Sequence, residues 1–81
     1  MIEEFKDIIL KYFEAEGKIL KRENIVLRQY IEIKQYAIGF FETTLPDFEY
    51  YEVIYDGIYD KFTLDVYKKI KSCKITRTNE E

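Results

Sequence analysis

Apolar residues in the first sixteen positions recur at steps of three and four, which is the period of an amphipathic helix. Glu3, Glu4 and Asp7 occupy the first turn, where carboxylates oppose the helix macrodipole. Gly17 is placed to end the helix as a left-handed cap. The pattern therefore predicts a helix over residues 2–16, with its buried stripe formed by Ile2, Phe5, Ile8, Ile9, Tyr12 and Phe13.

Residues 18–43 also fit a helical pattern, with a strand as the rival. Nine apolar residues fall within an arc of roughly 140° on a helical wheel: Ile19, Leu20, Val26, Leu27, Tyr30, Ile31, Ala37, Ile38 and Phe41. Asn24 could cap a helix that begins at Ile25. An alternation of side chains over 25–34 indicates a strand instead, but it fails at Gln29 and Gln35. The pattern favours the helix.

Two charged residues conflict with this second helix, because Glu23 and Lys34 fall in the middle of its apolar arc. They are eleven positions apart, roughly 16 Å along a helix, so they cannot pair with each other. Either each has a partner elsewhere, or Glu23 belongs to the connection before the helix.

The segment from Thr43 to Asp47 contains Pro46 and is the clearest break in the chain. After it, apolar residues recur at helical steps over seven turns: Phe48, Tyr51, Tyr55, Ile58, Phe62, Val66, Ile70 and Cys73. Thr63 could restart the helix. The spacing predicts one kinked helix or two consecutive ones.

These elements predict an all-α fold of three or four antiparallel packed helices. The alternative is α+β, with the N-terminal helix on a small antiparallel sheet and a hairpin at Asp56-Gly57. A two-residue turn there would set Asp60 against Val53 on one face, which is poor patterning, so the helical register is preferred.

The length of 81 residues fits one domain, which we expect to span residues 1–75 and to end in a frayed polar tail at 76–81. The apolar fraction of 47% is sufficient for a core. No apolar stretch approaches the roughly 20 residues of a membrane span. The lone Cys73 cannot form an internal disulfide, and we therefore expect a cytoplasmic protein.

Charge is segregated along the chain. Residues 1–41 are neutral, residues 42–67 carry −6 and residues 68–81 carry +3, which gives the net charge of −3. A long third helix with its acids early and its bases late would explain this layout through the macrodipole.

Little of the chain can support catalysis. There is no histidine, which removes the commonest general base and most zinc sites. Cys73 falls on the apolar stripe, Ser72 has no adjacent base, and the three glycines form no phosphate loop. We expect no enzyme activity, no cofactor and no metal site.

The sharpest candidate site is an acidic, tyrosine-rich helix face for a protein partner. Its residues are Glu49, Glu52, Asp56 and Asp60, with Tyr59 and Tyr67 beside them. On a helix these carboxylates would stand about 5–6 Å apart, a spacing comparable to that of phosphates along one DNA strand. The expected function is a non-enzymatic binding module, such as a DNA-mimic inhibitor from a phage or mobile element. Its partner would then be a basic nucleic-acid-binding protein.

Two further functions compete with this one. A small nucleic-acid-binding regulator would use the basic cluster of Lys68, Lys69, Lys71, Lys74 and Arg77. The second is a purely structural homo-oligomer. Independently of the function, apolar residues that fall outside the helical stripes predict a homodimer: Ile25, Ile33, Tyr36, Phe40, Tyr50, Val53 and Leu64.

Overall fold

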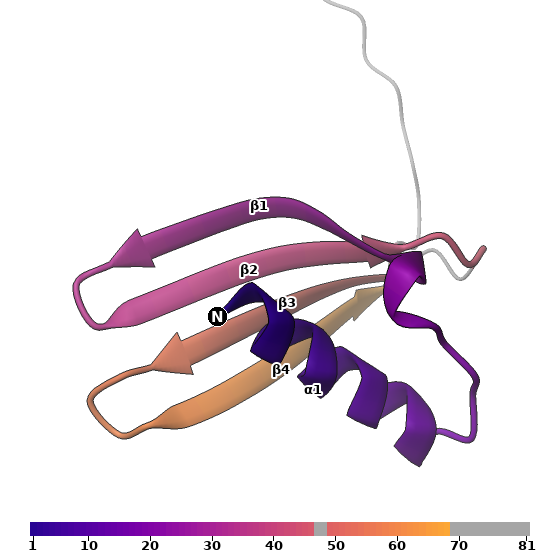
Figure 1. The fold of residues 1–81 in the computed structure, drawn as a ribbon, viewed down its shortest axis with the longest axis horizontal. Coiled ribbons are helices and arrows are strands. Elements are labelled where there is room, and N and C mark those ends of the chain that lie inside the picture. Colours follow the sequence, from indigo (N-terminus) through magenta and orange to yellow (C-terminus); the bar gives the residue numbers. More distant parts are fainter. Residues whose placement is uncertain (47–48, 69–81) are drawn as a thin grey trace, which may run out of the picture.

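The computed structural model describes residues 1–46 and 49–68, which form one helix and one antiparallel sheet. The elements are the helix α1 (Ile2–Ala15), a short 3₁₀ helix η1 (Arg22–Asn24), and the strands β1 (Ile25–Ile33), β2 (Tyr36–Thr43), β3 (Glu49–Asp56) and β4 (Lys61–Lys68). The strands are ordered β1-β2-β3-β4, so each pairs with its neighbour in sequence (Figure 1). The architecture is a meander covered on one face by a single helix.

The predicted all-α bundle is therefore wrong, and the α+β alternative describes the fold. The segments expected to form the second and third helices are strands. Their composition explains the outcome, because residues 25–41 are rich in β-branched and aromatic side chains, which pack well on a pleated surface. With so many apolar residues, a helical wheel finds an apolar arc even where the real period is two.

A β-bulge explains why the alternation in β1 fails at Gln29. The register of β1 against β2 shifts between Leu27 and Gln29, which leaves Arg28 as the extra residue. A bulge resets the alternation, so the side chains before and after it keep to their faces. The break in the alternation at Gln29, which counted against a strand, is therefore caused by a bulge within that strand.

The hairpin between β3 and β4 differs from the one that the sequence suggested. Its loop has four residues, 57–60, and Asp56 pairs with Lys61. The Asp56 carboxylate accepts hydrogen bonds from the backbone N–H groups of Ile58 at 2.9 Å and Tyr59 at 3.4 Å, which stabilises the turn. This longer loop shifts the register away from the poor pairing of Asp60 with Val53.

The N-terminal helix is confirmed, since α1 covers nearly the whole predicted range. Gly17 has a φ of +73°, and the N–H groups of Gly17 and Lys18 donate to the carbonyls of Glu14 and Phe13 at 3.0 and 2.9 Å. These two bonds make a Schellman cap, which satisfies carbonyls at the end of the helix. The apolar pattern of residues 2–16 and the glycine after it were sufficient to predict this helix.

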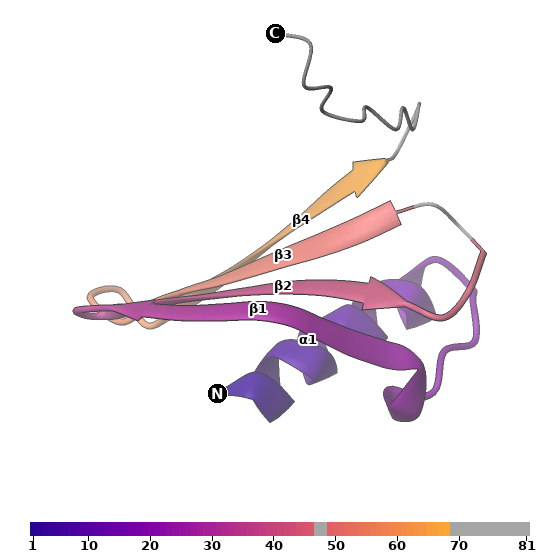
Figure 2. The same cartoon turned by 90° about the horizontal axis from the view of Figure 1, so that it is seen from above.

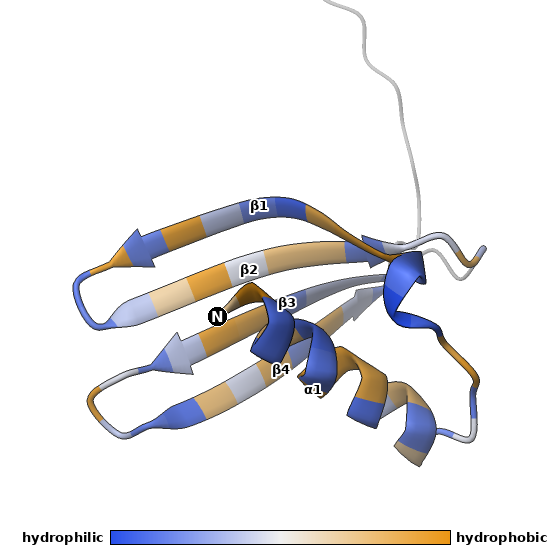
Figure 3. Cartoon of the chain, in the orientation of Figure 1, coloured by the Kyte–Doolittle hydropathy of each residue, from blue (hydrophilic) through white to orange (hydrophobic). Residues whose placement is uncertain are grey.

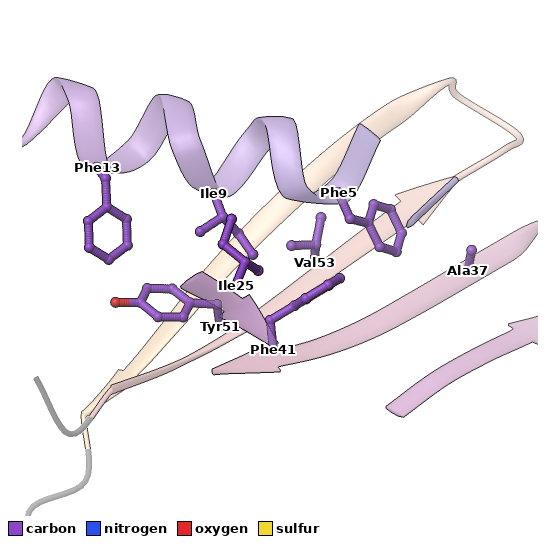
Figure 4. Packing of buried hydrophobic residues seen from close by; sticks show 8 residues of the cluster. All are labelled: Phe5, Ile9, Phe13, Ile25, Ala37, Phe41, Tyr51 and Val53. Carbon is purple, nitrogen blue, oxygen red and sulfur yellow. The ribbon is translucent and has the colours of Figure 1, made fainter. Parts of the chain in front are cut away.

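The core lies between α1 and one face of the sheet, called the inner face (Figures 2 and 4). Its buried residues are Phe5, Ile9, Phe13, Ile25, Ala37, Phe41, Tyr51 and Val53. Phe5 lies over Gly39 in β2 and contacts the rings of Phe41 and Phe62 edge-on, at centroid distances of 6.3 and 6.0 Å. The missing Cβ of Gly39 leaves the space that this ring fills.

The charged residues that conflicted with the second helix are both exposed. Glu23 lies in η1, and Lys34 lies in the two-residue turn between β1 and β2 with a φ of +54°. Asn24 caps no long helix; its side chain donates to the Thr44 hydroxyl at 3.0 Å and accepts from the Lys21 N–H. Neither charge needs a buried partner.

The limits of the predicted domain, at residue 75, and its polar tail lie outside the described residues. Within residues 1–46 and 49–68, no helix has the length and apolarity needed to cross a membrane.

Candidate functional site

The sheet face opposite α1, called the outer face, consists of four transverse rows of side chains. From β1 to β4 the rows are Val26–Glu42–Tyr50–Tyr67, Gln29–Phe40–Glu52–Asp65, Ile31–Ile38–Ile54–Thr63 and Ile33–Tyr36–Asp56–Lys61. In the edge-on view the helix covers the inner face alone, and nothing in the described chain lies over the rows (Figure 2).

Apolar residues are unusually common on this face. Nine of its sixteen paired positions are apolar or aromatic: Val26, Ile31, Ile33, Tyr36, Ile38, Phe40, Tyr50, Ile54 and Tyr67. Three isoleucines stand side by side across β1, β2 and β3, all of them partly exposed. Strand β2 consequently carries apolar or pale colour along most of its length, whereas the colours of β4 alternate (Figure 3). An antiparallel sheet with one solvated face normally places polar residues there.

The outer face is hollowed at its first two rows into an open groove of about 430 Å³. Phe40, Tyr50 and Tyr67 supply aromatic rings to its lining, and Glu42, Glu52 and Arg28 supply charges. Arg28, the bulge residue, reaches the Glu42 carboxylate at 3.1 Å. The volume lies in the range of small-ligand pockets, with apolar walls and a few polar groups.

Carboxylates and tyrosines meet repeatedly on the sheet. The Tyr67 hydroxyl donates to Glu52 at 2.8 Å across the outer face, and this bond raises the pKa of the Tyr67 phenol. On the inner side, a hydrogen bond to Glu32 at 2.7 Å raises the pKa of Tyr30 to about 12. A phenol that donates to a carboxylate resists ionisation, because the anion would lose the bond and meet a like charge.

The outer face is acidic. It carries Arg28 and Lys61 against four carboxylates, Glu42, Glu52, Asp56 and Asp65, so its formal charge is +2 − 4 = −2. Glu52 and Asp65 stand directly opposite each other on β3 and β4. Like charges at opposed positions destabilise a sheet. None of the ion pairs within residues 1–46 and 49–68 involves either of them.

The structure separates most of the residues predicted for the acidic helix face. Glu52 and Tyr67 come together in the groove. Glu49 faces the other side of β3, where it accepts from Tyr51. Asp56 ends β3 on the outer face, two rows from Glu52, and Tyr59 and Asp60 lie in the β3–β4 loop. A row of carboxylates at steps of three and four requires a helix, so the expected DNA-like row does not form on these strands. The macrodipole explanation for the acid-rich segment fails for the same reason.

Most of the predicted basic cluster lies outside the described residues: Lys69, Lys71, Lys74 and Arg77. Lys68 is exposed at the end of β4 and pairs with Glu49 in the register of β3 and β4.

Sequence reasoning did not assign the three outer-face isoleucines or the aromatic groove to a site. Part of the signal is present in the sequence, since Ile33, Tyr36, Phe40 and Tyr50 are apolar residues outside the helical stripes, and all four lie on the outer face. The other three, Ile25, Val53 and Leu64, pack in or against the core. The strand register determines which face of the sheet a residue occupies, and a prediction of helices contains no such register.

The fold and site define a two-layer α+β protein, with one helix on an antiparallel sheet and an acidic, aromatic face that no other part of residues 1–46 and 49–68 covers (Figure 2). Residues 2–77 match the model of a family of unknown function, DUF6275, and the chain belongs to that family. Comparisons with curated proteins and with solved structures found no match.

Proposed function

We propose that this protein is a non-enzymatic protein-binding module and that the outer face is its interface. The supporting observation is the row of three partly exposed isoleucines, Ile31, Ile38 and Ile54, on a face that is mostly apolar. Contiguous exposed apolar patches with a polar rim are typical of protein interaction sites. Tyrosine is also enriched at such interfaces, and three tyrosines lie on this face.

The charge of the outer face favours a protein over a nucleic acid as its ligand. Exposed rings on a four-stranded sheet suit base stacking, but a phosphate chain also requires a positive surface. Here Glu42, Glu52 and Asp65 surround the rings, and the face has a formal charge of −2. A basic protein surface gains from the same charges. A second copy of the chain would bring together two faces of the same sign, so the homodimer is the less favoured partner.

The inhibitor function remains part of this proposal only in its general form: a small acidic module that occupies a basic surface. Its location in a reducing, cytoplasmic compartment is likewise a proposal, and it rests on the lone Cys73.

Site-specific photocrosslinking tests the interface. We would place p-benzoylphenylalanine at Tyr50, which is 40% exposed on the outer face, and at Ile19, which is 89% exposed in the loop after α1. In extract of the native host, Tyr50 should give discrete protein adducts and Ile19 should give none. Introducing Ile54→Lys should remove the adducts at Tyr50, whereas Ile19→Lys should leave them. Adducts of equal yield from both positions would refute the interface.

A further inference from the structure

We propose that the outer-face groove is a receptor for an arginine side chain of the partner protein. We infer an arginine side chain because two kinds of group line the groove: the aromatic rings of Phe40, Tyr50 and Tyr67, and the carboxylate of Glu52. A guanidinium group is planar, stacks on aromatic faces and presents a fork of donors to a carboxylate. The inference rests on the proposed function, since it names the group that a partner brings to the outer face.

The position of the carboxylate supports a cationic guest. Glu52 lies beside Phe40 in one transverse row, and the tyrosines of the next row stand one step along the strands. Tyr67 donates its hydroxyl to one Glu52 oxygen at 2.8 Å, which orients the carboxylate and leaves its other oxygen for a guest. A side chain that lies over the rings therefore ends within reach of the charge.

The charge balance inside the groove also favours a cation. Glu42 is already paired with Arg28 at 3.1 Å, so those two groups neutralise each other. Glu52 and its neighbour Asp65 oppose each other across β3 and β4, with no ion-pair partner within residues 1–46 and 49–68. A guanidinium inserted beside them relieves the repulsion of this like-charged pair. An anionic or neutral guest would leave it in place.

The aromatic walls distinguish arginine from a simple ion. A cation within about 6 Å of a ring centroid is attracted by the ring's quadrupole, and arginine forms such contacts more often than lysine. Arginine and tyrosine are also the residues most enriched at the energetic centres of interfaces. The groove thus combines the two interactions that select a guanidinium over an ammonium group.

An NMR titration with small probes tests the assignment. We would record ¹⁵N spectra of the full chain with N-acetylarginine methylamide, and with the citrulline analogue, which has the same shape and no charge. The arginine probe should shift the signals of Phe40, Tyr50 and Tyr67, with an affinity about tenfold above that of the citrulline probe, as expected for one charge-assisted hydrogen bond. The lysine analogue should bind more weakly than the arginine probe.

The matched variants are Glu52→Gln in the groove and Glu14→Gln on the exposed side of α1. Glu52→Gln should lower the affinity for the arginine probe about tenfold, and Glu14→Gln should leave it unchanged. Equal binding of the arginine and citrulline probes, or of the arginine and lysine probes, would overturn the guanidinium assignment. Protein adducts from Tyr50 would still stand in that case, so the two proposals fail separately.

Discussion

The contact between Gly39 and the two core phenylalanines predicts that Gly39→Ala destabilises the protein. A Cβ at this position would lie 2.7 Å from Phe41 Cε1 and 2.7 Å from Phe5 Cδ2. Both rings are fully buried, and each is held by other packed side chains, so neither can move aside freely. Overpacking of this kind costs about 1–3 kcal/mol. At a position with room for a methyl group the same substitution stabilises by about 0.4–1 kcal/mol through the unfolded chain, so the middle of the two ranges gives a net loss of about 1.3 kcal/mol.

Urea unfolding followed by circular dichroism measures this change. A thermal scan should show a fall in melting temperature of roughly 5–10 °C, since 1 kcal/mol corresponds to about 4–8 °C in a domain of this size. The pair Gly39→Ala and Phe41→Leu provides the control. Leucine lacks the Cε1 atom that would lie 2.7 Å from the new methyl, so the double variant should lose less stability than the sum of the single ones. A Gly39→Ala protein as stable as the parent would refute this packing.

Three further outcomes follow from other contacts. Phe41→Ala should cost about 3–5 kcal/mol in denaturant unfolding, because it empties a site of zero exposure; a loss below 1 kcal/mol would contradict the core. Tyr30 should titrate near pH 12 in ¹³C NMR spectra of ring-labelled tyrosine, which resolve it from the other tyrosines, and Glu32→Gln should lower that pKa toward 10. Because the pKa of Tyr30 is raised in the folded protein, its hydrogen bond stabilises the fold fully below about pH 10, and this stabilisation is lost as the pH rises to about 12. A Tyr30 that titrates at the ordinary pKa of tyrosine would contradict this prediction. Arg22→Gln removes the contacts of Arg22 with Glu3 and Asp7, so it should destabilise slightly at low salt and not at 1 M salt, whereas a salt-independent loss would rule out an electrostatic role.

The N-terminal helix could be predicted from the sequence because its signals are local. The three- and four-residue steps of its apolar stripe and the glycine at position 17 act within a few turns. The strands could not be predicted as easily, since their defining signals are pairings between distant residues. The bulge at Arg28 breaks the alternation of β1, and only the register against β2 shows that the break is structural.

The candidate site could be predicted only in part from the sequence, for a related reason. A helical reading of 48–67 places Glu49, Glu52, Asp56 and Asp60 on one face, whereas the strands and their turn distribute them over two faces and a loop. The excess of apolar residues was visible in the sequence. Their position together on the outer face was not visible, because it depends on which residues of the four strands stand in the same row.

Solvent exposure of the isoleucine methyl groups tests the central claim most directly. Solvent paramagnetic relaxation enhancement, with a neutral gadolinium chelate and methyl-labelled isoleucine, reports on each of them separately. In dilute protein, the methyls of Ile31, Ile38 and Ile54 should relax more strongly than those of the buried Ile9 and Ile25. In concentrated extract of the native host, the three outer-face signals should become shielded while Ile19 stays exposed. Outer-face methyls that remain as accessible in the extract as in dilute solution would contradict the claim that this face binds a protein.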